Sequence, residues 1–556
     1  MAPTLLIAAM VALRAHTQKA DSQITKQTGD FGFARLSQHA GLQRLHCSNN
    51  FVLKKDRWHP LTETLFSESL LLNKNTKQIP ATWRRRLLVR VHDCRKAKCD
   101  WQGRQAIACN NREVVMIQMV GALAATVFVA ASCVGSQAVA QTKQLTLCWA
   151  AWDPANALVE LSKDFTTKTG IQMKYEFVPW TSYADRFLNE LNSKGKLCDV
   201  IIGDSQWIGG AAENGHYVKL NDFFAKEKIS MDDFMPATVV GYSEWPKNTP
   251  NYWALPAMGD AIGWTYRKDW FARPEIQAEF KKKHGRDLGP PQTWDELKQI
   301  AEFFQGREID GKKVYGAYIY TERGSEGITM GVTNALYDWG FQYDDPKKPY
   351  HMDGFVNSPD AAKGLEFYKS LYKCCTAPGM SNAYMSEGLD AFKSGQVAMQ
   401  MNFFAFFPGL YKDPNVGGDK IGFFVNPKQK LHFTQLGGQG ISVVSYSEHR
   451  DDALAYIKWF ANPDVQKKWW ALGGYSCHKA VLNDPGFTKS APFAADFLKS
   501  MDIVKDFWAE PAYAELLLDM QKRVHDYVVA DKGTAQEALD LLVKDWQKVF
   551  KEEGKI

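Results

Sequence analysis

The sequence predicts an α/β protein built from two lobes, and three observations lead to this fold class. Segments typical of strands and of helices alternate from Gln141 onward, a pattern that favours a largely parallel sheet covered by helices. The roughly 415 residues after residue 140 exceed what one hydrophobic core usually holds. No Gly/Ser-rich linker divides them. We therefore expect two lobes wound together by crossings of the chain.

Residues 1–112 differ from the rest of the chain in charge. They hold 19 Lys and Arg against 7 Asp and Glu, a net charge of +12, whereas the residues from Gln141 onward carry −6. The segment lacks sustained periodicity, and Cys94, Cys99 and Cys109 lack the spacing of a zinc site. Three interpretations compete: sequence upstream of the true translation start, a disordered basic arm for nucleic acid or membrane, and a processed leader. We favour the first.

Residues 113–140 have the pattern of a secretory signal peptide. An apolar stretch begins at Met116 or Met119 and ends near Cys133, and the small residues Ala138-Val139-Ala140 follow it. This order of an apolar region and an A-x-A triplet predicts cleavage before Gln141 and export to the periplasm. An uncleaved membrane anchor and lipidation at Cys133 are the less favoured alternatives.

The first elements after the signal form a βαβαβ pattern. Strands are predicted over residues 145–150, 171–179 and 198–204, and helices over 157–170 and 182–195. The third strand is a short apolar run suited to burial inside a parallel sheet. In a doubly wound sheet these strands take the order 2-1-3, so the first and third are neighbours.

Later helices are indicated by their caps and faces. The segment Thr293–Glu296 has the composition of a capping box, and Ser358-Pro359 places a hydroxyl cap before a proline at the first helical position. The helix that follows has a 4-3-4 spacing of apolar residues on one face, namely Ala361, Leu365, Tyr368 and Tyr372. Two final helices, over 512–529 and 534–550, are expected to pack back on the second lobe as a latch.

Several longer stretches resemble a known family. They are "DVIIGDSQWIGGAAENGHYVKLNDFF", "YWALPAMGDAIGWTYRKDWF", "TWDELKQIAEFF", "AFKSGQVAMQMNFFAFFPGL", "GGQGISVV" and "ALAYIKWFANPDVQKKWWALGGYSCHKAVL". Their order and spacing from Gln141 to Lys555 resemble the extracellular solute-binding proteins of bacterial ABC importers, in the sugar-binding, maltose-binding-like branch (family 1). No single stretch is a catalytic fingerprint.

The resemblance implies the two-lobe periplasmic-binding-protein fold of type II. In that fold each lobe is a mostly parallel sheet flanked by helices, and hinge crossovers join the lobes over a ligand cleft. We expect lobe 1 to comprise 141–256 plus about 442–500, and lobe 2 to comprise 257–441 plus about 501–556.

Residue types at the ends of the first three strands favour a sugar or polyol site. Such ligands combine hydroxyl groups with apolar C–H faces, so carboxylates, amides and aromatic rings suit them. Open α/β sheets bind ligands at the carboxyl ends of their parallel strands. Trp152-Asp153 follows the first predicted strand, Trp180 follows the second, and Asp204 and Gln206 lie at the end of the third. Each residue also has a structural alternative, since Asp153 and Asp204 can cap helices and any Trp can pack in the core.

Further candidates come from the resemblance alone, in the first crossover and the second lobe. Gly438 belongs among them because a backbone without Cβ can approach a ligand closely. The complete set of predicted ligand-binding residues is Trp152, Asp153, Trp180, Asp204, Gln206, Asp260, Tyr266, Glu322, Trp339, Asn402, Gly438 and Tyr475.

The predicted function is that of a receptor. It captures a sugar or polyol in the periplasm and delivers it to an inner-membrane ABC permease by lobe closure. We expect a monomer with no catalytic residue, no cofactor, no metal and no nucleic-acid partner. The alternatives are a secreted carbohydrate-active enzyme and a receptor for a phosphorylated polyol, for which Arg267 or Arg323 would bind the phosphate. The sequence has no G-x-S-x-G elbow, no H-E-x-x-H and no P-loop, which disfavours an enzyme.

Five cysteines follow the signal, and an odd number leaves at least one thiol outside an intramolecular bridge. Cys148 and Cys198 lie in strands predicted to be neighbours, so either a bridge or two buried thiols is open there. For Cys477, pairing with Cys374 or Cys375 is the bridge considered.

Overall fold

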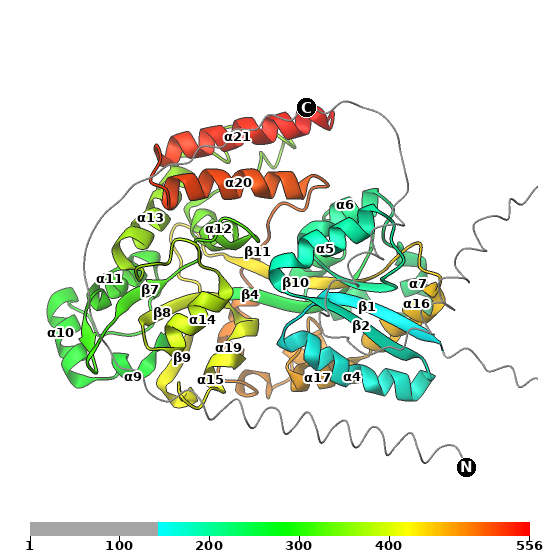
Figure 1. Ribbon diagram of the computed structural model, residues 1–556, viewed down its shortest axis with the longest axis horizontal. Helices are drawn as coiled ribbons and strands as arrows, with labels where there is room; N and C mark the ends of the chain where they lie inside the picture. Colours follow the sequence, from blue (N-terminus) through cyan, green and yellow to red (C-terminus); the bar gives the residue numbers. More distant parts are fainter. Residues whose placement is uncertain (1–142) are drawn as a thin grey trace, which may run out of the picture. The chain divides into compact units, whose positions relative to one another are not determined.

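A mixed sheet runs through the computed structural model, which describes residues 143–556 (Figure 1). Within that range the strand order is β2-β1-β3-β10-β4-β8-β7, with β11 paired to β10 and β9 paired to β4. The predicted extension over 1–112 and signal peptide over 113–140 lie outside the described residues. The α/β class predicted from the alternation of elements is confirmed.

The first three strands form the parallel part of the sheet. They are β1 (Gln144–Ala150), β2 (Gln172–Val178) and β3 (Val200–Asp204), and both pairings of β1 are parallel. Helices α4 (Asp153–Thr169) and α5 (Trp180–Asn192) connect them. The predicted order 2-1-3 is confirmed. The next elements are η3 (Ser205–Trp207), α6 (Ile208–Glu213), α7 (Asn221–Glu227), η4 (Met231–Asp233) and α8 (Pro236–Tyr242).

Two long strands, β4 (Leu255–Arg267) and β10 (Thr434–Val443), cross the molecule between its two halves (Figure 1). The first half is the part built on β1 to β3, and the second half is the part built on β7, β8 and β9. They are antiparallel to each other, and β10 is also antiparallel to β3. Farther along, β4 pairs in antiparallel register with β8 (Val397–Phe403) and β9 (Ile421–Val425). The expectation of a mostly parallel sheet in each lobe is therefore wrong for the second half. A chain that leaves one half on β4 must return on β10 in the opposite direction, which forces antiparallel neighbours.

Residues 268–420 supply further strands and helices of the second half. They are α9 (Lys268–Phe271), α10 (Pro274–His284), α11 (Trp294–Phe304), β5 (Glu308–Ile309), β6 (Lys312–Lys313), β7 (Tyr315–Tyr318), α12 (Gly327–Trp339), α13 (Pro359–Cys375), α14 (Met385–Lys393), η5 (Phe404–Phe406), α15 (Pro408–Tyr411) and η6 (Gly418–Lys420). Here β7 and β8 form a parallel pair.

The predicted caps are present with one difference. Ser358 Oγ accepts a hydrogen bond from the Ala361 amide at 3.2 Å, and Pro359 occupies the first position of α13. Thr293 Oγ1 accepts from the Glu296 amide at 3.2 Å, but the Glu296 carboxylate accepts from the Gln292 amide at 2.7 Å. The reciprocal half of the predicted capping box thus moves by one residue.

The C-terminal part of the chain returns to both halves. Its elements are α16 (Arg450–Phe460), α17 (Pro463–Leu472), α18 (Lys479–Leu482), η7 (Phe487–Lys489), α19 (Ala494–Met501), β11 (Val504–Lys505), α20 (Tyr513–Val528) and α21 (Ala535–Glu552). Helix α17 packs on α4, whereas α19 packs on β4 and β9. Helices α20 and α21 lie against α12 and α13, at the top of Figure 1, as the predicted latch requires. We propose that the second lobe resumes at α19 rather than near residue 500.

One of the two disulfides considered from the sequence is present, and the one that would involve Cys477 is not. Cys148 and Cys198 form a disulfide that joins β1 to the segment entering β3, with Cα atoms 5.7 Å apart. Cys374 bonds to its neighbour Cys375, and Cys477 is a buried free thiol. The pairing of Cys477 with either of them is therefore wrong, because those two sulfur atoms bond to each other and Cys477 is packed inside the core.

The first disulfide is expected to stabilise the fold by closing a long loop. Its partners are 50 residues apart, and the loop-entropy argument gives about 4 kcal/mol for such a closure. The double variant Cys148→Ala/Cys198→Ala should lower the free energy of unfolding in urea by about that amount. Cys477→Ala is the matched control, since it removes a buried sulfur without opening a loop. Alkylation of more than one thiol per chain within residues 143–556, in denaturant without reductant, would contradict the pairings.

Candidate ligand-binding site

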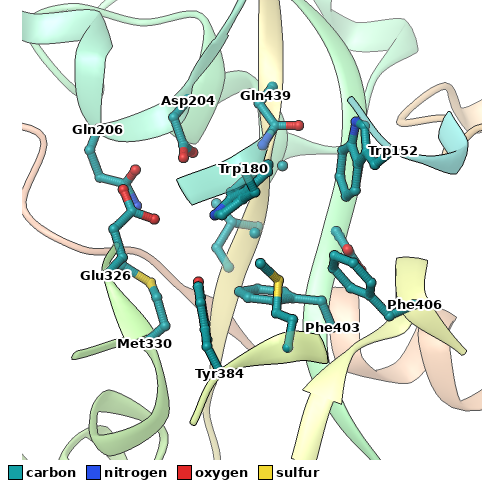
Figure 2. Close-up of a pocket in the computed structure, with 15 residues that line it drawn as sticks. Trp152, Trp180, Asp204, Gln206, Glu326, Met330, Tyr384, Phe403, Phe406 and Gln439 are labelled. Carbon is teal, nitrogen blue, oxygen red and sulfur yellow. The ribbon is translucent and has the colours of Figure 1, made fainter. Parts of the chain in front are cut away.

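A cavity lies between the two halves, beside the crossing strands, and encloses about 350 Å³ of empty space, part of it open to solvent. Figure 2 shows the side chains that line it. They are Trp152, Trp180, Asp204, Gln206, Asp260, Glu326, Met330, Tyr384, Met385, Phe403, Phe406, Leu436, Gly437, Gly438 and Gln439.

Four lining residues follow the parallel strands, where the sequence predicted them. Trp152 follows β1, Trp180 begins α5 after β2, Asp204 ends β3, and Gln206 lies in the 3-10 turn after it. The Asp204 carboxylate accepts from the Ser205 amide at 2.9 Å, so it caps that turn and also faces the cavity. The predicted helix-capping role of Asp204 is therefore seen here as a cap of the 3-10 turn, and its role in ligand binding stays a prediction.

The crossing strands supply the floor of the cavity. Gly438 on β10 has φ +113°, and a Cβ there would lie 2.2 Å from the Met258 carbonyl oxygen, so a side chain would not fit. Asp260 on β4 also lines the cavity. Its carboxylate accepts from the Ala261 amide at 2.8 Å and from the Ala405 amide at 3.3 Å. It thereby ties the crossing strand to the turn η5.

The second half contributes mostly aromatic and sulfur-containing side chains. The Trp152 ring lies 5.3 Å from the Trp180 ring and 5.7 Å from the Phe406 ring, measured between centroids. Figure 2 shows Asp204, Gln206 and Glu326 gathered at one end of the cavity, with Trp152 and Phe406 at the other. One end of the cavity thus gathers carboxyl and amide groups and the other is dominated by aromatic rings, which suits a ligand with both polar and apolar surface.

Several polar atoms around the cavity have no hydrogen-bond partner among the described residues. They are the Oε1 atoms of Gln206 and Gln439, the Trp152 indole Nε1 and the Tyr384 hydroxyl. Gln206 and Gln439 are only 2% and 1% exposed. Burying an unpaired polar group costs about 1–3 kcal/mol. A bound molecule that pairs with these atoms would recover part of this cost.

Burial changes the protonation of the carboxyl groups in the cavity. It raises the pKa of Asp204 to about 8, with repulsion from Asp506 as the second cause, and it raises the pKa of Asp260 to about 8. The pKa of Glu326 is raised by burial and then by the charges of Asp204 and Asp506. Near pH 7, Asp204 and Asp260 therefore hold protons and can donate as well as accept hydrogen bonds.

Half of the predicted site residues do not line the cavity. Asn402 is used by the protein, since its Oδ1 accepts from the Tyr320 hydroxyl at 2.8 Å and its Nδ2 donates to the Met385 carbonyl at 3.1 Å. The buried Tyr475 donates to the Phe404 carbonyl at 2.9 Å. Both residues support the wall of the cavity from behind.

The other four lie farther into the core or at the surface. Trp339 packs on α13, with its ring 4.8 Å from that of Phe367. Tyr266 packs on Phe271 at 4.8 Å. Asp153 is exposed in the first turn of α4, and Glu322 is partly buried before α12. In each case the residue type suited a ligand, but the packing of the element directs the side chain elsewhere.

Some lining residues were missed although they lie in motifs that the sequence had singled out. Glu326 lies four residues after Glu322, and its positive φ of +72° turns the chain so that Glu326 lines the cavity. Phe406 and Gln439 belong to the stretches "NFFAFF" and "GGQG". Tyr384 and Met330 carried no signal, because a tyrosine or methionine in such a segment usually indicates core packing.

Two other kinds of function have no support in residues 143–556. This part of the chain contains no group of three or more His, Cys, Asp or Glu side chains placed to hold a metal ion. No helix within the same range has both the length and the apolar character that crossing a membrane requires.

The chain belongs to the bacterial extracellular solute-binding protein family, whose sequence profile matches residues 151–467, more than half of the chain. A probable amino-acid ABC transporter periplasmic-binding protein of Sinorhizobium fredii is 23% identical over 60% of this chain and 73% of its own length. A mannitol-binding protein of Pseudomonas aeruginosa is 23% identical over 59% and 67%. The chain is therefore an ABC transporter solute-binding protein rather than an enzyme.

Solved structures show the same fold. An ABC transporter solute-binding protein of Agrobacterium radiobacter in complex with ribitol is 23% identical, with a TM-score of 0.62 over 73% of this chain and 99% of that one. Maltose-bound MalE3 of T. maritima is 22% identical, with a TM-score of 0.61 over the same shares. The predicted periplasmic-binding-protein fold is thus confirmed.

The buried carboxyl group of Asp204 is expected to make stability depend on pH. The native protein keeps this proton up to a pH near 8, whereas an unfolded aspartate loses it near pH 3.8. Unfolding therefore releases a proton between these values, and the free energy of unfolding falls as the pH rises. Between pH 7.0 and 7.8, urea unfolding of the Asp204→Asn variant should show a shallower fall than the parent.

Asp451→Asn provides the control, because Asp451 is exposed in the first turn of α16. It should keep the slope of the parent. Equal slopes in the parent and Asp204→Asn would show that Asp204 is ionised in the native state.

Proposed function

We propose that this protein captures a sugar or polyol in the periplasm and delivers it to an inner-membrane ABC permease by closing its lobes. The observation that carries the proposal is the cavity itself, which combines aromatic faces, buried carboxyl groups and two buried amide oxygens that have no hydrogen-bond partner among the described residues. Hydroxyl groups of such a ligand pair with the polar end, and its C–H faces lie against the rings. The names of the relatives that bind mannitol, ribitol and maltose support this class of ligand.

Contacts across the cleft support closure as the signal. The rings of Trp152 and Phe406 come from opposite halves and lie 5.7 Å apart. On the polar side, the Trp207 indole donates to the Tyr513 hydroxyl at 3.0 Å, and that hydroxyl donates to Glu326 at 3.5 Å. A ligand that contacts both halves shifts the population toward this arrangement. A permease can then distinguish a loaded receptor from an empty one by the position of the lobes.

The alternative of a phosphorylated polyol has little support in the cavity. No Lys, Arg or His is among its lining residues in the described chain. The Arg267 guanidinium pairs with Asp269 at 2.8 Å and lies over the Trp270 ring, and Arg323 is exposed outside the cavity. A phosphate would therefore meet carboxyl groups without a compensating cation.

The proposal predicts which substitutions weaken binding. In a fluorescence titration with the best ligand from a thermal-shift screen of sugars and polyols, Asp204→Asn and Trp152→Ala should each raise the Kd at least tenfold, about 1.4 kcal/mol. The first change removes a hydrogen-bonding carboxyl group, and the second removes an aromatic face. Binding should also change the tryptophan emission, because Trp152 and Trp180 line the cavity.

The matched control for Trp152→Ala is Trp470→Ala. Trp470 is partly buried against Phe487 and lies outside the cavity. It should cost stability without raising the Kd. If Asp204→Asn and Trp152→Ala both bind the ligand as tightly as the parent, the cavity is not the binding site. If the parent cleaves a glycoside in the screen, the receptor function is wrong.

A further inference from the structure

The charged side chains in the cavity are all acidic. Asp204, Asp260 and Glu326 line it, and no Lys, Arg or His does so within residues 143–556. All three are buried, with at most 7% of each residue exposed. Buried carboxylates usually pair with a cation, because an unpaired buried charge is costly. The cavity therefore has a deficit of positive charge.

Two half-buried lysines, Lys247 and Lys505, do not fill this deficit. Lys247 Nζ donates to the carbonyl oxygens of Val240 at 3.0 Å and Gly241 at 2.7 Å, and its charge acts on Asp506 and Glu244. Lys505 Nζ donates to the Phe341 carbonyl at 3.1 Å and lies over the Tyr337 ring. Neither lysine lines the cavity. A cation that serves its carboxyl groups has to come with the ligand.

Two amide oxygens without a hydrogen-bond partner among the described residues also lie in this cavity. They belong to Gln206 and Gln439, and both residues are buried. Figure 2 shows the Gln206 amide beside the Glu326 carboxylate, near Asp204. An ammonium group has three donors and no acceptor, so it matches such a group of acceptors better than a hydroxyl does.

Aromatic rings complete this environment. Trp152, Trp180, Tyr384, Phe403 and Phe406 line the cavity with the carboxyl groups. Ring faces attract cations as well as C–H groups, and the attraction for a cation is stronger where water is excluded. Burial raises the pKa of Asp204 and of Glu326, and repulsion from Asp506 raises both further, so these carboxyl groups favour their protonated form while the cavity holds no cation.

We propose that the ligand is a sugar or polyol that carries a protonated primary amine. Its ammonium group lies among Asp204, Gln206 and Glu326, and its carbon chain lies against the Trp152 and Phe406 rings. This inference rests on the proposed receptor function and narrows its class of ligand. It disfavours phosphorylated and carboxylated ligands, including α-amino acids, because their anionic groups would face the carboxyl groups.

The test compares amines with the hydroxyl compounds that match them. Isothermal titration of the mature protein at pH 7 would use the pairs 1-amino-1-deoxy-D-glucitol and D-glucitol, 1-amino-1-deoxy-D-ribitol and ribitol, D-glucosamine and D-glucose, and D-galactosamine and D-galactose. D-Glucitol 6-phosphate and L-glutamate serve as anionic and zwitterionic probes. In the pair that binds most tightly, the amine should bind at least tenfold more tightly than its partner.

Two isosteric variants locate the ammonium group. Asp204→Asn and Glu326→Gln keep the shape of the cavity, while each removes a carboxyl group that can ionise beside a bound ammonium group. Each should reduce the preference for the amine at least fivefold while changing the Kd of the hydroxyl partner less. The exposed control Asp451→Asn should leave both affinities unchanged.

The outcomes separate this inference from the function on which it rests. If the hydroxyl member of the tightest pair binds as well as the amine, or better, the inference is overturned and the receptor for neutral polyols stands. If the phosphate or glutamate binds most tightly, the inference is overturned as well. If neither the amines nor their hydroxyl partners bind, both this inference and the proposed function of a sugar or polyol receptor are wrong.

Discussion

The antiparallel pairing of β4 with β10 is the interaction on which the rest of this structure depends. These strands cross between the halves in opposite directions, and their hydrogen bonds hold the two parts of the sheet in one register. The same pairing places Gly438 beside Gly259, where the backbone itself forms the cavity floor. Because β10 also pairs with β3, it brings Gln439 opposite Asp204. The register of the crossing strands thus fixes both the hinge and the polar end of the site.

The cost of this arrangement lies in the carboxyl groups that it buries. Asp204 comes from the first half, Glu326 from the second and Asp506 from the segment after β11. Burial raises the pKa of all three, and the charge of Asp506 raises the pKa of the other two further. Such a cluster lowers the free energy of unfolding of the ligand-free protein as the pH rises from 3.8 to about 8, because the unfolded chain ionises there while native Asp204 keeps its proton. A binding protein tolerates this cost where the ligand supplies the missing donors. Binding and stability are therefore coupled through the same side chains.

The two sides of the cleft meet through contacts of different character. On the apolar side, aromatic rings from both halves approach each other and adapt to small shifts of position. On the polar side, the Trp207 indole, the Tyr513 hydroxyl and the Glu326 carboxylate form a directional chain. Tyr513 is the first residue of α20, so the C-terminal helices take part in this series of hydrogen bonds in addition to packing on the second half. A ligand that touches Glu326 is thus linked to the contact that holds the halves together.

The sequence by itself determined the parallel strands, their order and the residues that follow them, because alternating periodicity and strand ends are local features. Trp152, Trp180, Asp204 and Gln206 were found in this way, and the resemblance to the family added Asp260 and Gly438. Only the tertiary structure decided which residues of the second half reach the cavity. Trp339 packs into the core while Glu326 lines the cavity, since packing between helices and one left-handed residue set these directions. Composition and spacing do not encode the contact between two halves that are far apart in the sequence.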